Sequence, residues 1–470
     1  MTETINGRAS AASEDLGGAL GNTTQTCPRV ILEIGVFFDG TLNNAANSLE
    51  GGRGGSYANA RSNVALLSEL YKREQRHWIR NSCGGYERKF ASHYVPGPGT
   101  VSGGGDDWFQ GNGLGMGTNG VESRVYHACL RIGQMVRELS PGVEPTEIIM
   151  DVFGFSRGAA AARYFVNCFR QGFIMYDENF VNRQRASLPA GRRVRFRFVG
   201  IFDTVAAIGI GTNDDNGPVN VHVSTAQAEK IFHLTAGDEY RENFRLNHNI
   251  DRSTRVGNTS LQSGSGGEAR ELPGAHSDVG GGYRDAGDTV DLGPSRTYSN
   301  TSRAAAQSAR DAIDGRPLVG ASDFWVRQGW INANETEGGT VTQASAVRTR
   351  PMFSRTGNLS YLYEYTVTPR LHRPWVQIGL SRIALRIMYD KAVAQSVPFT
   401  AFPSGGEYAV PPGLRPVAAK LIAGQSLTGD EYRSTLRNFG HVSSNVGSVG
   451  MSPEPNFVRV IYPNRSGQAR

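Results

Sequence analysis

Hydrophobic and polar positions alternate along the chain in a way that predicts an ordered series of strands and helices. Residues 29 to 38 (RVILEIGVFF) are apolar and β-branched, as in a strand buried on both faces. Between Asn63 and Trp78 the apolar side chains fall on one side of a helix. A second helix of this kind is predicted from Val125 to Leu139.

Three elements then follow in close order. EIIMDVFGF (147 to 155) is a predicted strand, SRGAAAARYFVNCF (156 to 169) a helix that is apolar nearly all round, and VRFRFVGIFDTV (194 to 205) a second strand. Strand, helix and strand in this order predict a parallel βαβ unit. The expected fold class is therefore α/β, with a mainly parallel central sheet and helices on both faces. A further strand at 229 to 235 and a helix at 375 to 395 extend the pattern.

The same pattern divides the chain into four parts. Residues 1 to 28 are polar and predict a flexible leader, and residues 29 to 285 are expected to form the core domain. Residues 286 to 360 are rich in Ser, Thr, Asn and Arg, which indicates an insertion or accessory subdomain. Residues 361 to 470 are expected to complete the core domain.

One apolar cluster interrupts the polar insertion. Phe324, Trp325, Val326 and Trp330 lie within ASDFWVRQGWI. Such a cluster either contacts a membrane as a lid or anchor or forms the core of a small subdomain. The second alternative is favoured, because clusters of this kind are more often small cores.

Composition narrows the class of protein. The 470 residues carry a net charge of +6, and no stretch approaches the roughly 20 apolar residues of a membrane span. The first 26 residues lack the pattern of a Sec signal, so the protein is expected to be cytoplasmic in the cell that makes it. The positive charge gathers around residues 183 to 197, where it favours either a solvated face or an anionic surface such as phospholipid. No basic motif with interleaved aromatic residues or zinc pattern supports nucleic-acid binding.

The stretch VFFDGTLNN (36 to 44) resembles the D-x-D-G-T motif of haloacid dehalogenase phosphatases. The position of their nucleophilic aspartate is Phe37 here, so no aspartyl-phosphate can form. Asp39 is therefore expected to brace a turn at the end of the first strand.

GFSRG (154 to 158) matches the G-x-S-x-G motif of a nucleophile elbow. The motif lies where a buried strand meets a buried helix, and the small neighbours Gly154 and Gly158 fit the strained turn that such an elbow requires. Ser156 is the predicted nucleophile, and the backbone N–H of Arg157 is a predicted oxyanion donor.

A serine nucleophile needs a base and a carboxylate that orients it, which follow the serine in the order Asp, His in this fold. Asp203 ends the strand after the elbow helix, and Asp238, after the next strand, is the alternative acid. His276, in ELPGAHSDVGGGYRD, is the predicted base. The second oxyanion donor is expected at Gly40 or Thr41, in the turn after the first strand. This acyl-transfer chemistry requires no cofactor and no metal.

Six motifs in the same order resemble the catalytic domain of type VI secretion lipase effectors. They are FFDGTLNN, YVPGPGT, GFSRGAAAAR, GIFDTVAAIG, HLTAGDEYRENF and GAHSDVGGGY, between residues 29 and 285. The resemblance continues more faintly from 360 to 445. The family commonly has D-E-R-R where this chain has Asp238-Glu239-Tyr240-Arg241, and residues 300 to 355 match no family pattern.

The resemblance implies an α/β-hydrolase fold and phospholipase A activity on bacterial membrane lipids, with a triad of Ser156, Asp203 and His276. It also implies delivery by the type VI machinery on a secretion spike or carrier protein, action in the periplasm of a target cell, and a cognate immunity protein in the producer. Two alternatives stay open. One is an esterase or thioesterase acting on a soluble substrate, and the other is a non-catalytic scaffold with a hydrolase fold.

Overall fold

The computed structural model describes residues 29–465 apart from a set of gaps, and the predicted leader, residues 1–28, lies outside it. Among the described helices, none combines the length and the apolar composition that a bilayer crossing requires. The gaps are at residues 53, 74–75, 83, 107–119, 172, 177–182, 187–192, 209–218, 285–286, 293–294, 317–322, 333–339, 355, 377, 447 and 449.

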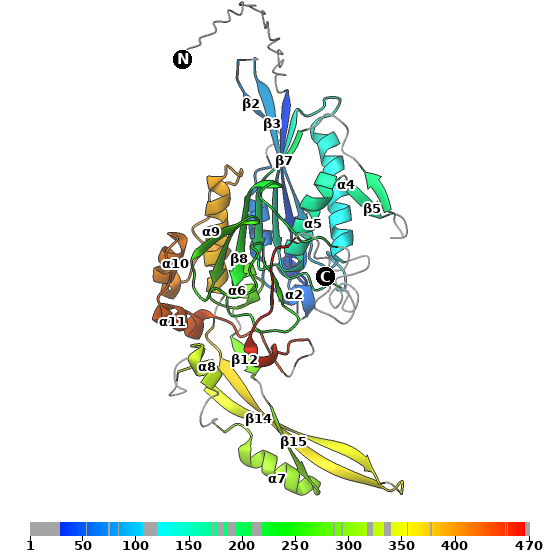
Figure 1. Ribbon diagram of the computed structural model, residues 1–470, viewed down its shortest axis with the longest axis vertical. Coiled ribbons are helices and arrows are strands. Elements are labelled where there is room, and N and C mark those ends of the chain that lie inside the picture. Colours follow the sequence, from blue (N-terminus) through cyan, green and yellow to red (C-terminus); the bar gives the residue numbers. More distant parts are fainter. Residues whose placement is uncertain are drawn as a thin grey trace, which may run out of the picture.

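An eight-stranded sheet forms the centre of the molecule (Figure 1). Its outer strands β2 and β10 run antiparallel to their neighbours, and the six strands between them are mutually parallel, which confirms the predicted mainly parallel sheet. In sheet order the strands are β10 (Leu261–Gly264), β11 (Gly267–Leu272), β8 (Ala228–Ala236), β7 (Arg193–Phe202), β4 (Glu147–Phe155), β1 (Val30–Phe38), β3 (Tyr86–Val95) and β2 (His77–Ile79).

Helices cover both faces of this sheet, as the apolar pattern predicts (Figure 1). On one face, α4 (Val121–Leu139) and α5 (Arg157–Gln171) pack against alternate side chains of β1, such as Ile34. On the other face, Phe37 lies in a second core with α3 (Asn63–Leu70), α9 (Gly379–Ala394) and α10 (Arg415–Ile422). Burial on both faces explains why β1 and β4 read as nearly continuous apolar runs.

The helix predicted from Asn63 to Trp78 is too long. α3 ends at Leu70, and Tyr71 has extended backbone angles. The Tyr71 hydroxyl donates a hydrogen bond to buried Asp151 over 2.8 Å, and Tyr71 also forms a β-bridge with Phe399. These contacts hold Tyr71 in an extended conformation, so the helix ends before it. The chain that follows forms the edge strand β2.

The shorter elements connect the layers of the body. The strand β9 (Leu246–Asn247) pairs in parallel with β16 (Ile461–Tyr462) in a separate two-stranded sheet, which brings a late segment of the chain beside the loop after β8. The others are α1 (Ala45–Glu50), α2 (Gly55–Ala58), β5 (Phe173–Tyr176), β6 (Arg183–Ala186), α6 (His276–Gly280), α11 (Gly429–Phe439) and the 3-10 turns η3 (Gly406–Tyr408), η4 (Pro412–Leu414) and η5 (Pro455–Phe457).

A second, antiparallel sheet extends away from the body (Figure 1). Its long strands β14 (Thr340–Phe353) and β15 (Leu359–Arg373) pair along their whole length as a hairpin. The domain boundaries expected at residues 286 and 360 stay a prediction. The other elements of this part are β12 (Asp288–Asp291), β13 (Arg296–Asn300), α7 (Arg303–Ile313) and α8 (Asp323–Arg327).

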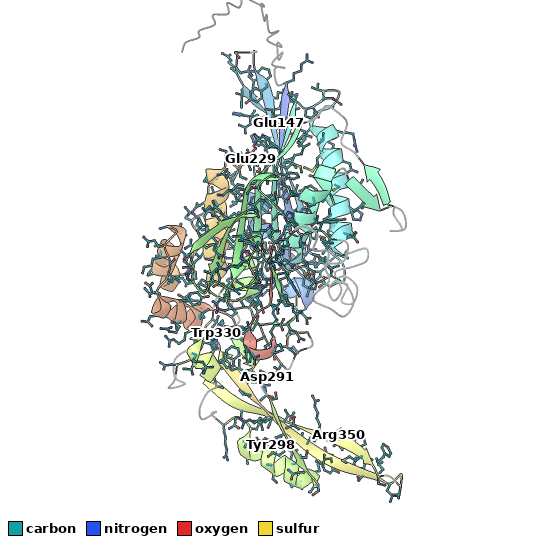
Figure 2. All side chains as sticks on the ribbon, viewed as in Figure 1. Glu147, Glu229, Asp291, Tyr298, Trp330 and Arg350 are labelled. Carbon is teal, nitrogen blue, oxygen red and sulfur yellow. The ribbon has the colours of Figure 1, made fainter. Side chains whose placement is uncertain are left out.

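Aromatic side chains join the second sheet to the body. Trp325 and Trp330 are buried in a core that includes Leu371 of β15 and Leu436 of α11. The Trp330 indole donates a hydrogen bond to the Tyr240 hydroxyl over 3.0 Å, and Figure 2 shows Trp330 where the two parts meet. These tryptophans therefore form a small core, the alternative favoured by the sequence, and are not exposed to contact a membrane. The Phe324 side chain lies outside the described part.

Two arginines of the basic stretch at 183 to 197 are engaged in ion pairs. Arg195 contacts Glu147 at 2.8 Å and Glu229 at 2.6 Å, two residues labelled in Figure 2. Arg197 is buried and makes two hydrogen bonds to Asp151, of 3.0 and 2.5 Å. The charges of these two arginines are therefore paired with acidic residues of the sheet and do not form a free basic surface.

Replacing Trp330 with Ala should lower the free energy of unfolding by about 3–5 kcal/mol, because it removes a fully buried ring and its hydrogen bond. Chemical denaturation followed by circular dichroism measures this change. Tyr361→Ala, at a half-exposed position on the hairpin, is the matched control and should change stability by no more than about 0.5 kcal/mol. Equal effects of the two substitutions would contradict the role assigned to Trp330.

Candidate active site

Ser156 occupies a strained turn between β4 and α5. Its φ of 58° lies in the left-handed region, which non-glycine residues seldom adopt. The Ser156 N–H donates to the Phe202 carbonyl over 3.1 Å, and its carbonyl accepts from Ala159 over 3.0 Å. The residue thus bridges the ends of two adjacent strands and the first turn of the helix, as a nucleophile elbow does.

Gly154 and Gly158 leave no room for a side chain. A Cβ on Gly154 would lie 2.4 Å from the Gly158 carbonyl oxygen, and one on Gly158 would lie 2.2 Å from the carbonyl oxygen of Asp39. Real Cβ contacts are never this short, so both positions of the motif are fixed by packing. The second contact also shows that the turn after β1 lies against the elbow.

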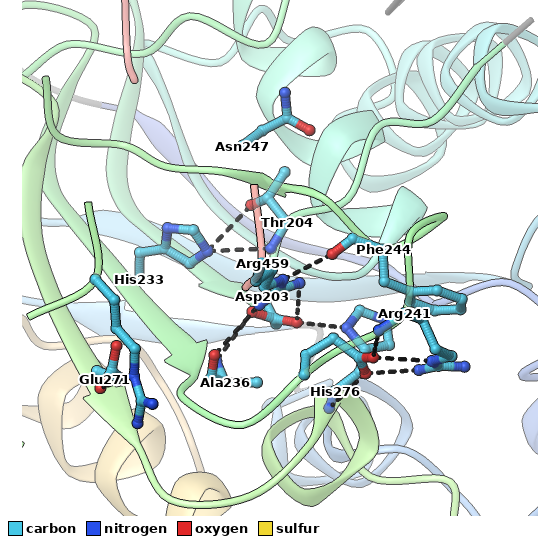
Figure 3. A network of polar contacts seen from close by, with 12 residues as sticks. Asp203, Thr204, His233, Ala236, Arg241, Phe244, Asn247, Glu271, His276 and Arg459 are labelled. Carbon is cyan, nitrogen blue, oxygen red and sulfur yellow. Dashed lines mark hydrogen bonds and ion pairs between the residues drawn. The ribbon is translucent and has the colours of Figure 1, made fainter. Parts of the chain in front are cut away.

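Asp203 and His276 are in direct contact at the same edge of the sheet (Figure 3). The His276 Nδ1 lies 2.5 Å from the Asp203 Oδ2. Asp203 follows β7, the neighbour of β4, and His276 begins α6 soon after β11. Because all three strands are parallel, their carboxyl ends meet where Ser156 lies.

Arg459 holds the other side of the Asp203 carboxylate (Figure 3). Its Nη1 lies 2.8 Å from Asp203 Oδ1, and its Nη2 lies 2.8 Å from Oδ2. The Ala236 N–H donates a further hydrogen bond to Oδ1 over 2.9 Å. Burial alone would raise the pKa of Asp203, but the Arg459 charge and the His276 hydrogen bond outweigh it and hold the pKa well below its usual value.

The His276 ring is enclosed by aromatic side chains. Its centroid lies 4.6 Å from that of Phe155, next to Ser156, and 5.0 Å from that of Phe244. Burial lowers the pKa of His276 below its ordinary value, although the Asp203 carboxylate opposes this shift. The buried Nε2 has no hydrogen-bond partner among the described residues. A neutral imidazole with an open Nε2 has the form a general base requires.

A second carboxylate reaches His276 from the turn after β8. Glu239 Oε2 accepts a hydrogen bond from the His276 backbone N–H over 3.2 Å, and Glu239 pairs with Arg241 at 2.8 Å. Burial would raise the pKa of Glu239, but the Arg241 charge lowers it to about 2. The DEYR segment therefore anchors the backbone of the predicted base, a role that the sequence alone did not assign.

Asp238, the alternative acid, points elsewhere. Its Oδ2 accepts hydrogen bonds from the Tyr432 hydroxyl over 2.7 Å and from the Gly274 N–H over 3.0 Å. No contact with His276 is among its interactions, so the geometry favours Asp203 as the carboxylate that orients the histidine.

The turn after β1 is braced by Asp39, as expected. Asp39 accepts hydrogen bonds from the Gly40 N–H over 2.7 Å and from the Tyr94 hydroxyl over 2.6 Å, and burial raises its pKa to about 6. The Gly40 N–H is thus already engaged by a carboxylate. The Thr41 side-chain oxygen is buried and has no partner among the described residues. Because Asp39 already engages the Gly40 N–H, Thr41 is the remaining predicted backbone donor in this turn.

A second buried histidine and aspartate pair adjoins the site. His441 Nδ1 lies 2.7 Å from Asp278 Oδ1, and the His441 N–H donates to Oδ2 over 2.8 Å. Asp278 belongs to α6, two residues after His276, so this pair fixes the helix that carries the predicted base. In the described part of the chain, no three histidine, cysteine or carboxylate side chains gather as metal ligands would.

The sequence predicts no role for Arg459 or for Glu239. Arg459 lies 256 residues after Asp203 and belongs to no motif. Only the partial match of the DEYR segment to the family pattern drew attention to the neighbourhood of Glu239.

Part of the chain matches a known protein family. Residues 173–305 match the family model described as the catalytic domain of Tle1-like phospholipase effectors of the type VI secretion system. This span includes Asp203 and His276 but not Ser156. The comparison with curated proteins finds no match.

Two solved structures are similar to the chain. One is the Tle1 effector bound to the VgrG spike from the type VI secretion system, with 23% identity, coverage of 93% of this chain and 94% of that chain, and a TM-score of 0.61. The other is an uncharacterized protein from Pseudomonas aeruginosa, with 18% identity, coverage of 85% and 51%, and a TM-score of 0.44. The first similarity shows a common fold. The family model, over residues 173–305, confirms the resemblance to type VI secretion phospholipase effectors that the sequence motifs indicate.

Proposed function

We propose that this protein is a serine-dependent phospholipase A with an α/β-hydrolase fold, which cleaves ester bonds of membrane glycerophospholipids through an acyl-enzyme. The observation that carries the proposal is the contact of 2.5 Å between His276 and Asp203 at the sheet edge that also bears the strained Ser156 turn. The match to the phospholipase effector model supports the choice of substrate class.

The mechanism follows from the tautomer of His276. Because Nδ1–H donates to Asp203, the lone pair is on Nε2, where it accepts the proton of the Ser156 hydroxyl as the oxygen attacks the ester carbonyl. The ionised Asp203 stabilises the imidazolium that forms. The proton then passes to the leaving alcohol, and water releases the fatty acid in a second step.

The oxyanion of each tetrahedral intermediate lies at the start of α5. The Arg157 N–H is one donor in this proposal, and the Thr41 N–H of the adjacent turn is the second. Asp39 and Gly158 determine where that turn lies, through the Gly40 hydrogen bond and the close backbone contact.

The resemblance also supports a biological role. In this proposal the protein is made in the cytoplasm, leaves the cell by the type VI machinery on a spike protein, and acts as an antibacterial toxin from the periplasm of the target cell. An immunity protein protects the producer. The solved effector of similar fold is bound to a spike, which supports a spike partner for this chain.

The hairpin tip is the proposed membrane contact, since the tryptophan cluster is buried. Phe353 is 73% exposed, and Leu359, its cross-strand partner, is half-exposed. Tyr361 lies on the same face of the hairpin, and Arg348 and Arg350 lie on the other face. Apolar and aromatic tips flanked by arginine suit the interface of an anionic bilayer.

Ser156→Ala should abolish the release of fatty acid from mixed phospholipid vesicles, with a loss of at least about a thousandfold, because the nucleophile is removed. Mass spectrometry of the released acids measures it, and Ser68→Ala, a buried serine of α3, is the control. Activity on a soluble short-chain ester alone would favour a soluble esterase or thioesterase. If the wild-type protein cleaved neither substrate, the scaffold alternative would replace this proposal.

Asp203→Asn should reduce turnover by about ten-thousandfold, because the amide favours the wrong tautomer of His276. Asp238→Asn should leave turnover within about tenfold of wild type, since Asp238 binds Tyr432 and Gly274 instead. Steady-state kinetics on both folded variants decides between them. A larger loss at Asp238 would mean that the acid is wrongly assigned.

Replacing Phe353 and Leu359 together with Ser should weaken binding to anionic vesicles by about tenfold or more, because two exposed apolar side chains are lost. Turnover of a soluble ester should not change. Trp78→Ser, which removes an exposed ring from β2 at the opposite end of the molecule, is the control (Figure 1). Equal binding of all three proteins in vesicle sedimentation would contradict the proposed contact.

A further inference from the structure

Arg459 reaches Asp203 from a segment that is fastened across the carboxyl edge of the sheet. The Glu454 N–H donates to the Tyr240 carbonyl over 2.7 Å, and the Val460 carbonyl accepts from Leu246 over 3.0 Å. Farther on, the Asn464 side chain donates to the Val223 carbonyl over 2.7 Å. These bonds fix the segment on both sides of Arg459.

The guanidinium itself has four acceptors. Besides the two oxygens of Asp203, it donates from Nε to the Phe244 carbonyl over 2.7 Å and from Nη1 to the Ala236 carbonyl over 3.2 Å. Figure 3 shows Arg459 between Asp203 and Phe244. A planar donor group held on so many sides leaves the Asp203 carboxylate little freedom to rotate.

Resting on the proposed function, we propose that Arg459 is a positioning residue that fixes the Asp203 carboxylate toward His276 and offsets part of its negative charge. Other charged groups also act on His276. Glu239 accepts from its backbone N–H, and Arg241 pairs with Glu239. Arg459 differs from them because it acts on the carboxylate that binds the imidazole.

The two parts of this role have separate consequences. Without the guanidinium, the carboxylate can turn away from Nδ1, which lowers the rate at every pH. Without its positive charge, the full charge of Asp203 acts on His276 and favours the imidazolium. The acid limb of the pH profile then moves to higher pH. A residue that only stabilised the fold would not produce this second effect.

The test compares Arg459→Met and Arg459→Lys with the wild-type protein. In Arg459→Met, kcat/KM on a soluble ester should fall roughly tenfold or more, and its acid limb should rise by about 0.5 to 1 pH unit. In Arg459→Lys, which keeps the charge but loses the planar fork, the rate should fall while the acid limb stays near that of wild type. An unshifted acid limb in a folded Arg459→Met variant would overturn the proposal.

A readout independent of activity separates this inference from the proposed function. The NMR titration of the His276 ring, assigned by its loss in His276→Gln, should show the same upward shift in Arg459→Met even if the protein hydrolyses no ester. Arg197→Met is the matched control, because Arg197 also pairs through two nitrogens with a buried aspartate, Asp151. It should leave the His276 titration unchanged. If Arg459→Met does not fold, the test rests on Arg459→Lys. A kcat/KM of Arg459→Lys equal to that of the wild-type protein at every pH would then overturn the proposal.

Discussion

The steric limit at the turn between β4 and α5 determines much of the architecture. Ser156 has a φ of 58° because the chain reverses from a central strand into a buried helix within one residue. The turn tolerates this only because Gly154 and Gly158 allow backbone to approach backbone, and the second approach is to the turn after β1. The positions of the turn after β1 and of the predicted nucleophile therefore depend on the same backbone contact. Asp39 supplies the carbonyl oxygen in this approach, and its carboxylate accepts a hydrogen bond from the Gly40 N–H.

Two carboxylates and two arginines surround one histidine in this buried site. Asp203 pairs with Arg459, Glu239 pairs with Arg241, and each carboxylate also accepts a hydrogen bond from His276. Each of these two carboxylates therefore has an arginine beside it. Burying a carboxylate without a partner would cost far more free energy than burying a matched pair. Burial keeps the imidazole neutral, and the Arg459 charge keeps Asp203 ionised beside it.

Local patterns in the sequence predict the features that depend on local physics. The β4 strand, the α5 helix and the GFSRG turn follow from apolar periodicity and small residues, and strand order explains why Asp203 and His276 lie near Ser156. Long-range contacts account for what was missed. The helix that begins at Asn63 ends early because Tyr71 binds Asp151, and Arg459 reaches Asp203 from a segment without any motif. A single sequence contains no pattern that reports such pairs.

The same separation along the chain has a consequence for folding. Asp203 and Arg459 are 256 residues apart, and the sheet that aligns them is built largely from parallel strands joined by crossovers. Bringing two residues so far apart in the chain into contact costs conformational entropy, which the rest of the fold must offset. The contact between Arg459 and Asp203 therefore depends on the folding of the chain between them. An unfolded molecule has all the chemical groups of the proposed site, but they lie far apart, so the proposed site exists only in the folded protein.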